Sequence, residues 1–184
     1  MKKSFLILLM MTFVSALVVM GCGEDNSSSQ DQSQEPAAEK VQGTVSDEKM
    51  SYDESAPNLL VSFANTGCKQ DANTTRAESF YSKETIVYEA TQDGGLIVHH
   101  NNILYGCTAE ISSMANIQGN IIEIYEKTEH NADVDCVCPY DLKMEVGGLK
   151  QGSYTLVIGG NSCHTITIPI EYTTQLKGEF VVRE

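Results

Sequence analysis

Apolar residues recur along most of the chain in short runs, many of them alternating with polar positions and separated by turn residues. Asp93-Gly94-Gly95 and Gln118-Gly119-Asn120 are strong turn signals. A helical period of 3.6 is not evident, and only residues 109–117 fit either a strand or a short helix. We therefore predict strands at residues 58–63, 83–90, 96–105, 121–125, 141–146, 154–158, 165–172 and 179–182.

Eight or nine short strands with regular turns are typical of an all-β fold, an antiparallel β-sandwich. The stretch from Gly148 to Ile158 resembles a turn-plus-strand found in prealbumin-like and immunoglobulin-like modules. Gly152 makes the turn, and Tyr154, Leu156 and Ile158 point to one face. The resemblance implies a sandwich architecture and no particular activity.

The first 21 residues have the pattern of a secretory signal. Lys2 and Lys3 precede an apolar run shorter than the roughly 20 residues of a membrane-spanning helix. The run ends at Val19-Met20-Gly21-Cys22, which resembles the lipobox of bacterial lipoproteins. This resemblance implies that residues 1–21 are removed and that lipid on Cys22 tethers the protein to a membrane. An uncleaved anchor helix is the alternative.

Residues 22–55 are polar and acidic, with nine acids against two lysines after Cys22. Such a segment buries too little apolar surface to order itself, so we expect a disordered linker and a folded domain at 56–184. Gly23-Glu24-Asp25 resembles the surface-export signal of some Gram-negative lipoproteins, which favours the outer membrane with the leaflet open. The domain has 16 acids, eight bases and no basic patch, so nucleic acid is not an expected partner.

Five cysteines remain once Cys22 is assigned to lipid, so at most two disulfides form and one thiol is left. If the chain is extended after Cys136, then Cys136 and Cys138 share the core face. Their Cα atoms are then roughly 6.5–7 Å apart, which disfavours a bond between them. Cys107 is the best partner for one of the two, and the remaining pairing stays open. The disulfide candidates are Cys68, Cys107, Cys136, Cys138 and Cys163.

A metal site is the alternative interpretation of these cysteines. Cys107, Cys136 and Cys138 could join His100 around zinc or copper, with His99 or His164 as substitutes for His100. The spacing is not the Cys-x₂-Cys of common zinc folds, and an oxidising compartment favours disulfides. The main interpretation is therefore a disulfide-stapled domain without a cofactor.

Other polar residues carry weaker signals. Alternation sends His99 and His100 to opposite faces, and the adjacent Cys163 and His164 also point apart if they lie on a strand. The chain has no phosphate-binding glycine loop, dinucleotide fingerprint or Gly-x-Ser-x-Gly motif. We expect an acidic, solvated rim from Glu123, Glu126, Glu129, Asp133, Asp135 and Asp141.

The sequence resembles uncharacterised small bacterial lipoproteins at His100-Asn101-Asn102, at Cys107 and at Cys136-Val137-Cys138-Pro139-Tyr140-Asp141-Leu142. This resemblance implies a shared scaffold and no known activity. We expect a lipid-anchored cell-envelope protein with a non-catalytic, disulfide-stapled binding or structural module, whose partner is an envelope protein or a glycan. The alternatives are a metal-binding lipoprotein and an unrecognised hydrolase on a β-sandwich.

Overall fold

The computed structural model describes residues 39–40, 42–69, 83–130 and 136–184. These residues form eleven strands, and none of them is helical. In this part of the chain, no helix is long and apolar enough to cross a membrane. The predicted signal at 1–21, Cys22 with its predicted lipid, and the acids Asp133 and Asp135 lie outside the described residues.

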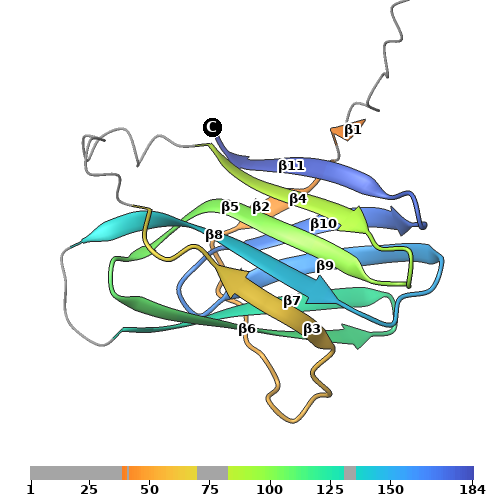
Figure 1. Ribbon diagram of the computed structural model, residues 1–184, viewed down its shortest axis with the longest axis horizontal. Helices are drawn as coiled ribbons and strands as arrows, with labels where there is room; N and C mark the ends of the chain where they lie inside the picture. Colours follow the sequence, from red (N-terminus) through yellow and green to blue (C-terminus); the bar gives the residue numbers. More distant parts are fainter. Residues whose placement is uncertain (1–38, 41, 70–82, 131–135) are drawn as a thin grey trace, which may run out of the picture. The chain divides into compact units, whose positions relative to one another are not determined.

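The strands form two sheets (Figure 1). Neighbouring strands are antiparallel except in the pairs β1–β11 and β7–β9, which are parallel. In order across the six-stranded sheet the strands are β1 (Glu39–Lys40), β11 (Lys177–Arg183), β4 (Glu84–Ala90), β5 (Leu96–Gly106), β8 (Val137–Val146) and β3 (Leu60–Asn65). The five-stranded sheet contains, in order, β2 (Thr44–Ser46), β10 (Thr165–Tyr172), β9 (Gly152–Gly160), β7 (Ile121–His130) and β6 (Ala109–Gln118).

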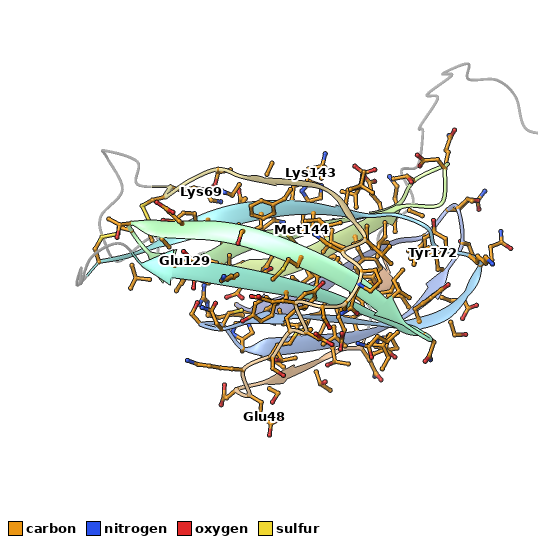
Figure 2. All side chains as sticks on the ribbon, turned by 90° about the horizontal axis from the view of Figure 1, so that it is seen from below. Glu48, Lys69, Glu129, Lys143, Met144 and Tyr172 are labelled. Atoms are coloured by element: carbon orange, nitrogen blue, oxygen red, sulfur yellow. A yellow bond between two sulfur atoms is a disulfide. The ribbon has the colours of Figure 1, made fainter. Side chains whose placement is uncertain are left out.

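The all-β sandwich expected from the sequence is confirmed, and the ambiguous segment 109–117 belongs to strand β6. Strand β8 shows why the two sheets pack together. Its side chains alternate, so that Met144 is fully buried while the neighbouring Lys143 is exposed (Figure 2). Cys138, Tyr140 and Leu142 are buried on the same face as Met144, as the alternation predicts.

The described strands begin before residue 56, where the sequence predicts the folded domain to start. Thr44, Val45 and Ser46 form β2 and pair with β10 at the edge of the five-stranded sheet. Tyr52 stacks on Tyr125 with ring centroids 5.5 Å apart. Composition alone predicted disorder here. Backbone pairing to an exposed sheet edge and one aromatic contact supply the stabilisation that few apolar side chains could provide.

A β-bulge interrupts strand β5 at the polar segment that follows His100. The pairing of β5 with β8 shifts between His100 and Ile103, and Asn102 has a positive φ of 57°. The Asn102 backbone N–H donates to Asp141 Oδ1 over 3.0 Å, and the Asn102 side chain donates to the Lys83 carbonyl over 2.8 Å. With this extra residue, His100 and Ile103 both face the core although they are three positions apart.

Strand β9 approaches β7 closely where Gly160 pairs with Glu126. A Cβ atom on Gly160 would lie 1.9 Å from the Glu126 carbonyl oxygen. Only glycine fits at this contact, which sets the position of the Glu126 backbone in the five-stranded sheet.

Candidate functional site

A cluster of charged side chains lies between the sheets around His100. The His100 ring is 1% exposed, and the side chains of Glu84 and Glu126 are 1% and 0% exposed. His100 Nδ1 lies 2.8 Å from Glu126 Oε1, and Nε2 lies 3.0 Å from Glu84 Oε1. A protonated imidazole donates from both ring nitrogens, so His100 can bridge the two carboxylates.

Three further side chains complete this arrangement. Tyr105 donates its hydroxyl to Glu126 Oε2 over 2.6 Å, and Arg183 Nη1 lies 3.3 Å from Glu84 Oε2. His164 Nε2 lies 3.0 Å from Glu84 Oε1. Two carboxylates thus face one imidazolium and one guanidinium, which is the pairing that buried charges require. We call these six residues the charged cluster: Glu84, His100, Tyr105, Glu126, His164 and Arg183.

The charged cluster is assembled from both sheets. Glu84 begins β4 and pairs in register with Arg183 at the end of β11. His100 enters the core through the bulge of β5, whereas Glu126 comes from β7 in the facing sheet. His164 follows the bend at 161–163, which two hydrogen bonds of 2.9 Å between the Asn161 side chain and the Thr128 backbone hold against β7.

The electrostatics of the charged cluster favour the ionised forms. Burial lowers the pKa of His100, but the carboxylates of Glu126 and Glu84 outweigh burial and raise this pKa to about 9. Burial raises the pKa of Glu84, and the close polar contacts and charges of His100 and His164 overcome it and lower this pKa to about 2. Near neutral pH, His100 is therefore a cation and Glu84 an anion.

Cys163 and Tyr105, by contrast, are held in their neutral forms. Burial, followed by the nearby Glu126 carboxylate, raises the pKa of the Cys163 thiol to about 12. The same two causes raise the pKa of Tyr105 far above its ordinary value. Cys163 Sγ lies 3.8 Å from Glu126 Oε2, at weak hydrogen-bond distance. Both groups therefore stay protonated and act as donors rather than as nucleophiles.

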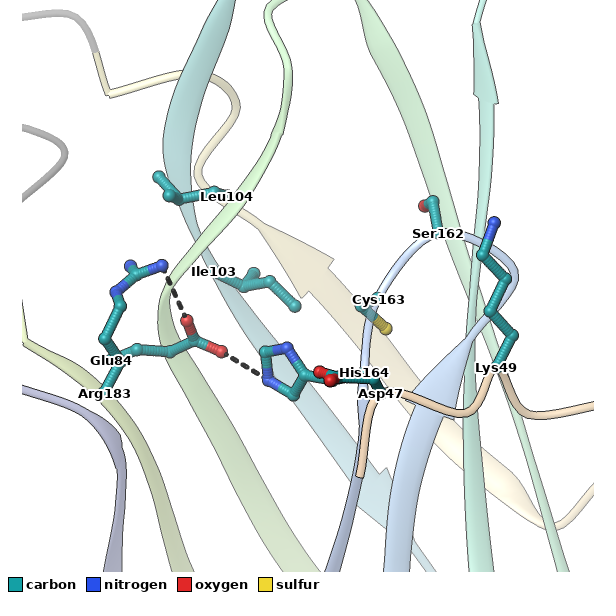
Figure 3. Close-up of a pocket in the computed structure, with 9 residues that line it drawn as sticks. All are labelled: Asp47, Lys49, Glu84, Ile103, Leu104, Ser162, Cys163, His164 and Arg183. Atoms are coloured by element: carbon teal, nitrogen blue, oxygen red, sulfur yellow. Dashed lines mark ion pairs between the residues drawn. The ribbon is translucent and has the colours of Figure 1, made fainter. Parts of the chain in front are cut away.

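A pocket of about 270 Å³ opens over one side of the charged cluster. Figure 3 shows Glu84 between Arg183 and His164, with Cys163 and Asp47 near His164. Charged and polar side chains make up most of the wall. The lining residues are Asp47, Lys49, Glu84, Ile103, Leu104, Ser162, Cys163, His164 and Arg183.

The predicted pairing of Cys107 with either Cys136 or Cys138 is confirmed. Cys107 bonds to Cys136, and the partner that the sequence left open for Cys138 is Cys68. Cys163 keeps a free thiol. Both bridges lie where the end of β5 meets the start of β8, and we call them the disulfide region.

The metal site predicted from Cys107, Cys136, Cys138 and His100 is not assembled. Sulfur atoms in disulfides offer no thiolate to a metal ion, and both nitrogens of His100 face glutamates instead. The structure brings another set of possible ligands together, namely Glu84, His100 and His164, with one donor atom from each within 4.8 Å of the others.

Two further expectations need correction. Glu126 was expected on a solvated acidic rim, but its side chain is fully buried because the polar partners of the facing sheet surround it. Cys163 and His164 were expected to point apart, yet both line the pocket because residues 161–163 form a bend rather than a strand. Glu84, Tyr105 and Arg183 were not predicted as site residues.

Two sequence signals pointed to the charged cluster, namely His164 as a substitute ligand in the alternative metal site and a polar segment within an apolar strand. The polar segment that starts at His99 interrupts an apolar strand, and it contains the buried His100 and the bulge. The partners of His100 come from separate strands, and their acids and bases look like ordinary surface charges in the sequence.

Comparisons with known proteins assign no family to this fold and site. No family model matches the chain, and no match was found among the curated proteins or among the solved structures.

Proposed function

We propose that this chain is a lipid-anchored protein of the cell envelope that displays a non-catalytic, disulfide-stapled binding module. The observation that carries this proposal is the pair of disulfides, Cys68–Cys138 and Cys107–Cys136. Disulfides persist in exported proteins and are rare where cellular thiols keep cysteines reduced. The secretory pattern of residues 1–21 and the lipobox at Cys22 support the same compartment.

The pKa values of the pocket groups support a binding role over catalysis. A general acid or base works best when its pKa lies near the working pH. The pKa is lowered to about 2 for Glu84 and raised to about 12 for Cys163. His100, with a pKa of about 9, is committed to two carboxylates behind the pocket. These groups are thus held in one protonation state near neutral pH.

The pocket is the place where we expect a ligand to bind. Its wall combines the cations Lys49 and Arg183 with the anions Asp47 and Glu84, so it suits a small polar group rather than an apolar one. A glycan or a polar segment of an envelope protein offers such groups. The linker between Cys22 and the first strands would hold this surface away from the membrane.

The anchoring part of the proposal is tested with the full chain in a Gram-negative host. A clickable fatty-acid analogue should label the wild type, which should fractionate with membranes. The Cys22→Ser variant should lose the label. Cys163→Ser is the matched control, because it removes another cysteine that lies outside both disulfides, and it should behave like the wild type. A labelled Cys22→Ser variant, or an unlabelled wild type in the soluble fraction, would contradict lipid anchoring.

The compartment is tested on the same preparation. Alkylation in denaturant without reductant should modify one thiol of the lipidated chain, and alkylation after reduction should modify five. Five reactive thiols before reduction would contradict the disulfide-stapled module.

A further inference from the structure

We propose that Glu84, His100 and His164 form a three-ligand site for a divalent transition-metal ion, with a coordination position open to the pocket. This inference goes beyond the proposed envelope function and stands independently of it. It also uses a different set of ligands from the cysteine site, whose sulfur atoms are bonded in disulfides.

The donor atoms are already near the spacing that a metal ion requires. The Nε2 atoms of His100 and His164 each lie 3.0 Å from the same Oε1 atom of Glu84. Zinc ligands at roughly 2.0–2.2 Å in a tetrahedral arrangement stand roughly 3.3–3.6 Å apart. Two imidazoles and one carboxylate form a donor set that zinc, copper and iron use in proteins.

The surroundings of His100 match those of a metal-ligating histidine. Such a histidine typically donates its second ring N–H to a carboxylate, which orients the ring and makes the ligating nitrogen a better donor. His100 Nδ1 has this contact with Glu126, and Tyr105 in turn donates to the other oxygen of Glu126. Because Nδ1 is committed to Glu126, Nε2 is the nitrogen left to ligate the metal.

Glu84 is oriented in a comparable way. Arg183 Nη1 lies 3.3 Å from Oε2, which leaves Oε1 to face both histidines. When a divalent ion binds, His100 releases its Nε2 proton to solvent, and the ion takes the position between Nε2 and Oε1. The carboxylate of Glu84 then binds the ion instead of the imidazolium.

His164 supplies a second, independent observation. Its Nε2 atom is buried and lies 3.0 Å from Glu84 Oε1, at ion-pair distance but without the alignment of a hydrogen bond. A buried polar atom without an aligned partner is costly, and a metal ion would satisfy it. The His164 side chain is also 26% exposed, so the site can be reached through the pocket (Figure 3).

The arrangement leaves room for an additional ligand. Three protein ligands with an open position are typical of zinc sites that bind water or a small molecule. The pocket lies on the side of Glu84 and His164, so the open position faces it. The net charge of −13 on the chain also favours accumulation of cations near the protein.

The test uses the full chain, purified in detergent without reductant and stripped with a chelator. Calorimetric titration with Zn²⁺ alone should show one site per chain. His164→Gln should bind Zn²⁺ at least tenfold more weakly, because it removes one of the three ligands. His164 is only partly buried, so this substitution disturbs the fold less than one at His100 would. His99→Gln is the matched control, since His99 precedes His100 on the same strand but points to the opposite face, and it should bind like the wild type. Circular dichroism and a count of free thiols equal to that of the wild type check that each variant is folded.

A measurement without variants keeps the test independent of folding. X-ray absorption of the Zn²⁺-loaded wild type should show nitrogen and oxygen neighbours and no sulfur. The proposal is overturned if the wild type binds no stoichiometric Zn²⁺, or if His164→Gln binds as tightly as the wild type. It is also overturned if His99→Gln weakens binding equally, or if sulfur appears among the nearest neighbours of the metal.

Discussion

The disulfide region and the charged cluster both involve strand β5, but the disulfides join neighbouring strands of the six-stranded sheet, whereas the charged cluster joins the two sheets. The disulfide region is covalent and follows the end of the strand, where Cys107 bonds to Cys136. The charged cluster is non-covalent and depends on His100 in the middle of the strand, between carboxylates from both sheets. A disulfide acts mainly by restricting the unfolded chain, whereas a buried ion network acts only in the folded state. The two regions should therefore respond differently to substitution, pH and reagents.

Glu126→Ala should give the largest effect. Removing one member of a buried charge network leaves its partners unpaired and costs about 3–5 kcal/mol. We expect the upper half of this range because both His100 and Tyr105 lose their contact with Glu126. Denaturant unfolding under non-reducing conditions measures the loss. Glu129→Ala, on the same strand but exposed, should change the free energy of unfolding by less than about 1 kcal/mol. Equal losses in the two variants would mean that the network contributes no more than a surface charge.

Removal of either disulfide should give the second-largest loss in the free energy of unfolding. Replacing Cys68 and Cys138 by alanine opens a loop of 70 residues and should cost about 4 kcal/mol, against about 3.5 kcal/mol for the 29-residue loop of Cys107 and Cys136. Unfolding free energies of the two double variants test this order. A much larger loss for the shorter loop would show that native packing, not chain entropy, dominates in the disulfide region.

The pH dependence of stability should separate the two regions. The pKa of His100 rises from its ordinary 6.5 to about 9 on folding, so its contribution is complete below pH 6.5 and is lost as the pH rises through 9. The free energy of unfolding of the metal-free protein should fall over this window, by at most about 1.4 kcal/mol per pH unit from one proton. The variant that lacks Cys107 and Cys136 should keep the same slope, because the disulfide it has lost does not titrate. A flat profile between pH 7 and 9 would contradict a protonated His100.

Acid should destabilise the folded protein by protonating Glu84 in the charged cluster. The pKa of Glu84 falls from 4.5 to about 2 on folding, so its contribution is present above pH 4.5 and is lost as the pH falls toward 2. Unfolding measured between pH 5 and 2 should therefore show a further loss of stability. Glu84→Gln should reduce this acid-dependent loss, and an unchanged loss would assign it to other carboxylates.

The smallest expected effect on stability is at Cys163. A thiol pKa raised to about 12 makes the reactive thiolate roughly a thousandfold rarer at pH 8 than in an ordinary cysteine. Iodoacetamide should thus modify the native protein very slowly and the denatured protein quickly, as followed by mass spectrometry. Cys163→Ala should change the free energy of unfolding by less than the loss of either disulfide. Rapid modification of the native protein would contradict the raised pKa of this half-buried thiol beside Glu126.

The sequence predicted the disulfide region better than the charged cluster. Alternation along 136–146 placed Cys136 and Cys138 on one face, and cysteine parity left one thiol, as the structure shows. The position of Cys107 after a strand was enough to suggest one pairing. For the charged cluster, the sequence offered the polar interruption that contains His100 and named His164 as a substitute ligand, but it assigned Glu126 to the surface.

The sequence by itself determined the all-β architecture and the restriction on the cysteine pairing, because alternation and parity are local properties of the chain. Tertiary structure decided which residues surround His100, since Glu84, Glu126 and Arg183 come from three different strands in two sheets. It also decided that Cys68, not Cys163, bonds to Cys138, and that residues 44–46 join a sheet edge. These outcomes depend on distances between segments far apart in the chain, and no local periodicity encodes such distances.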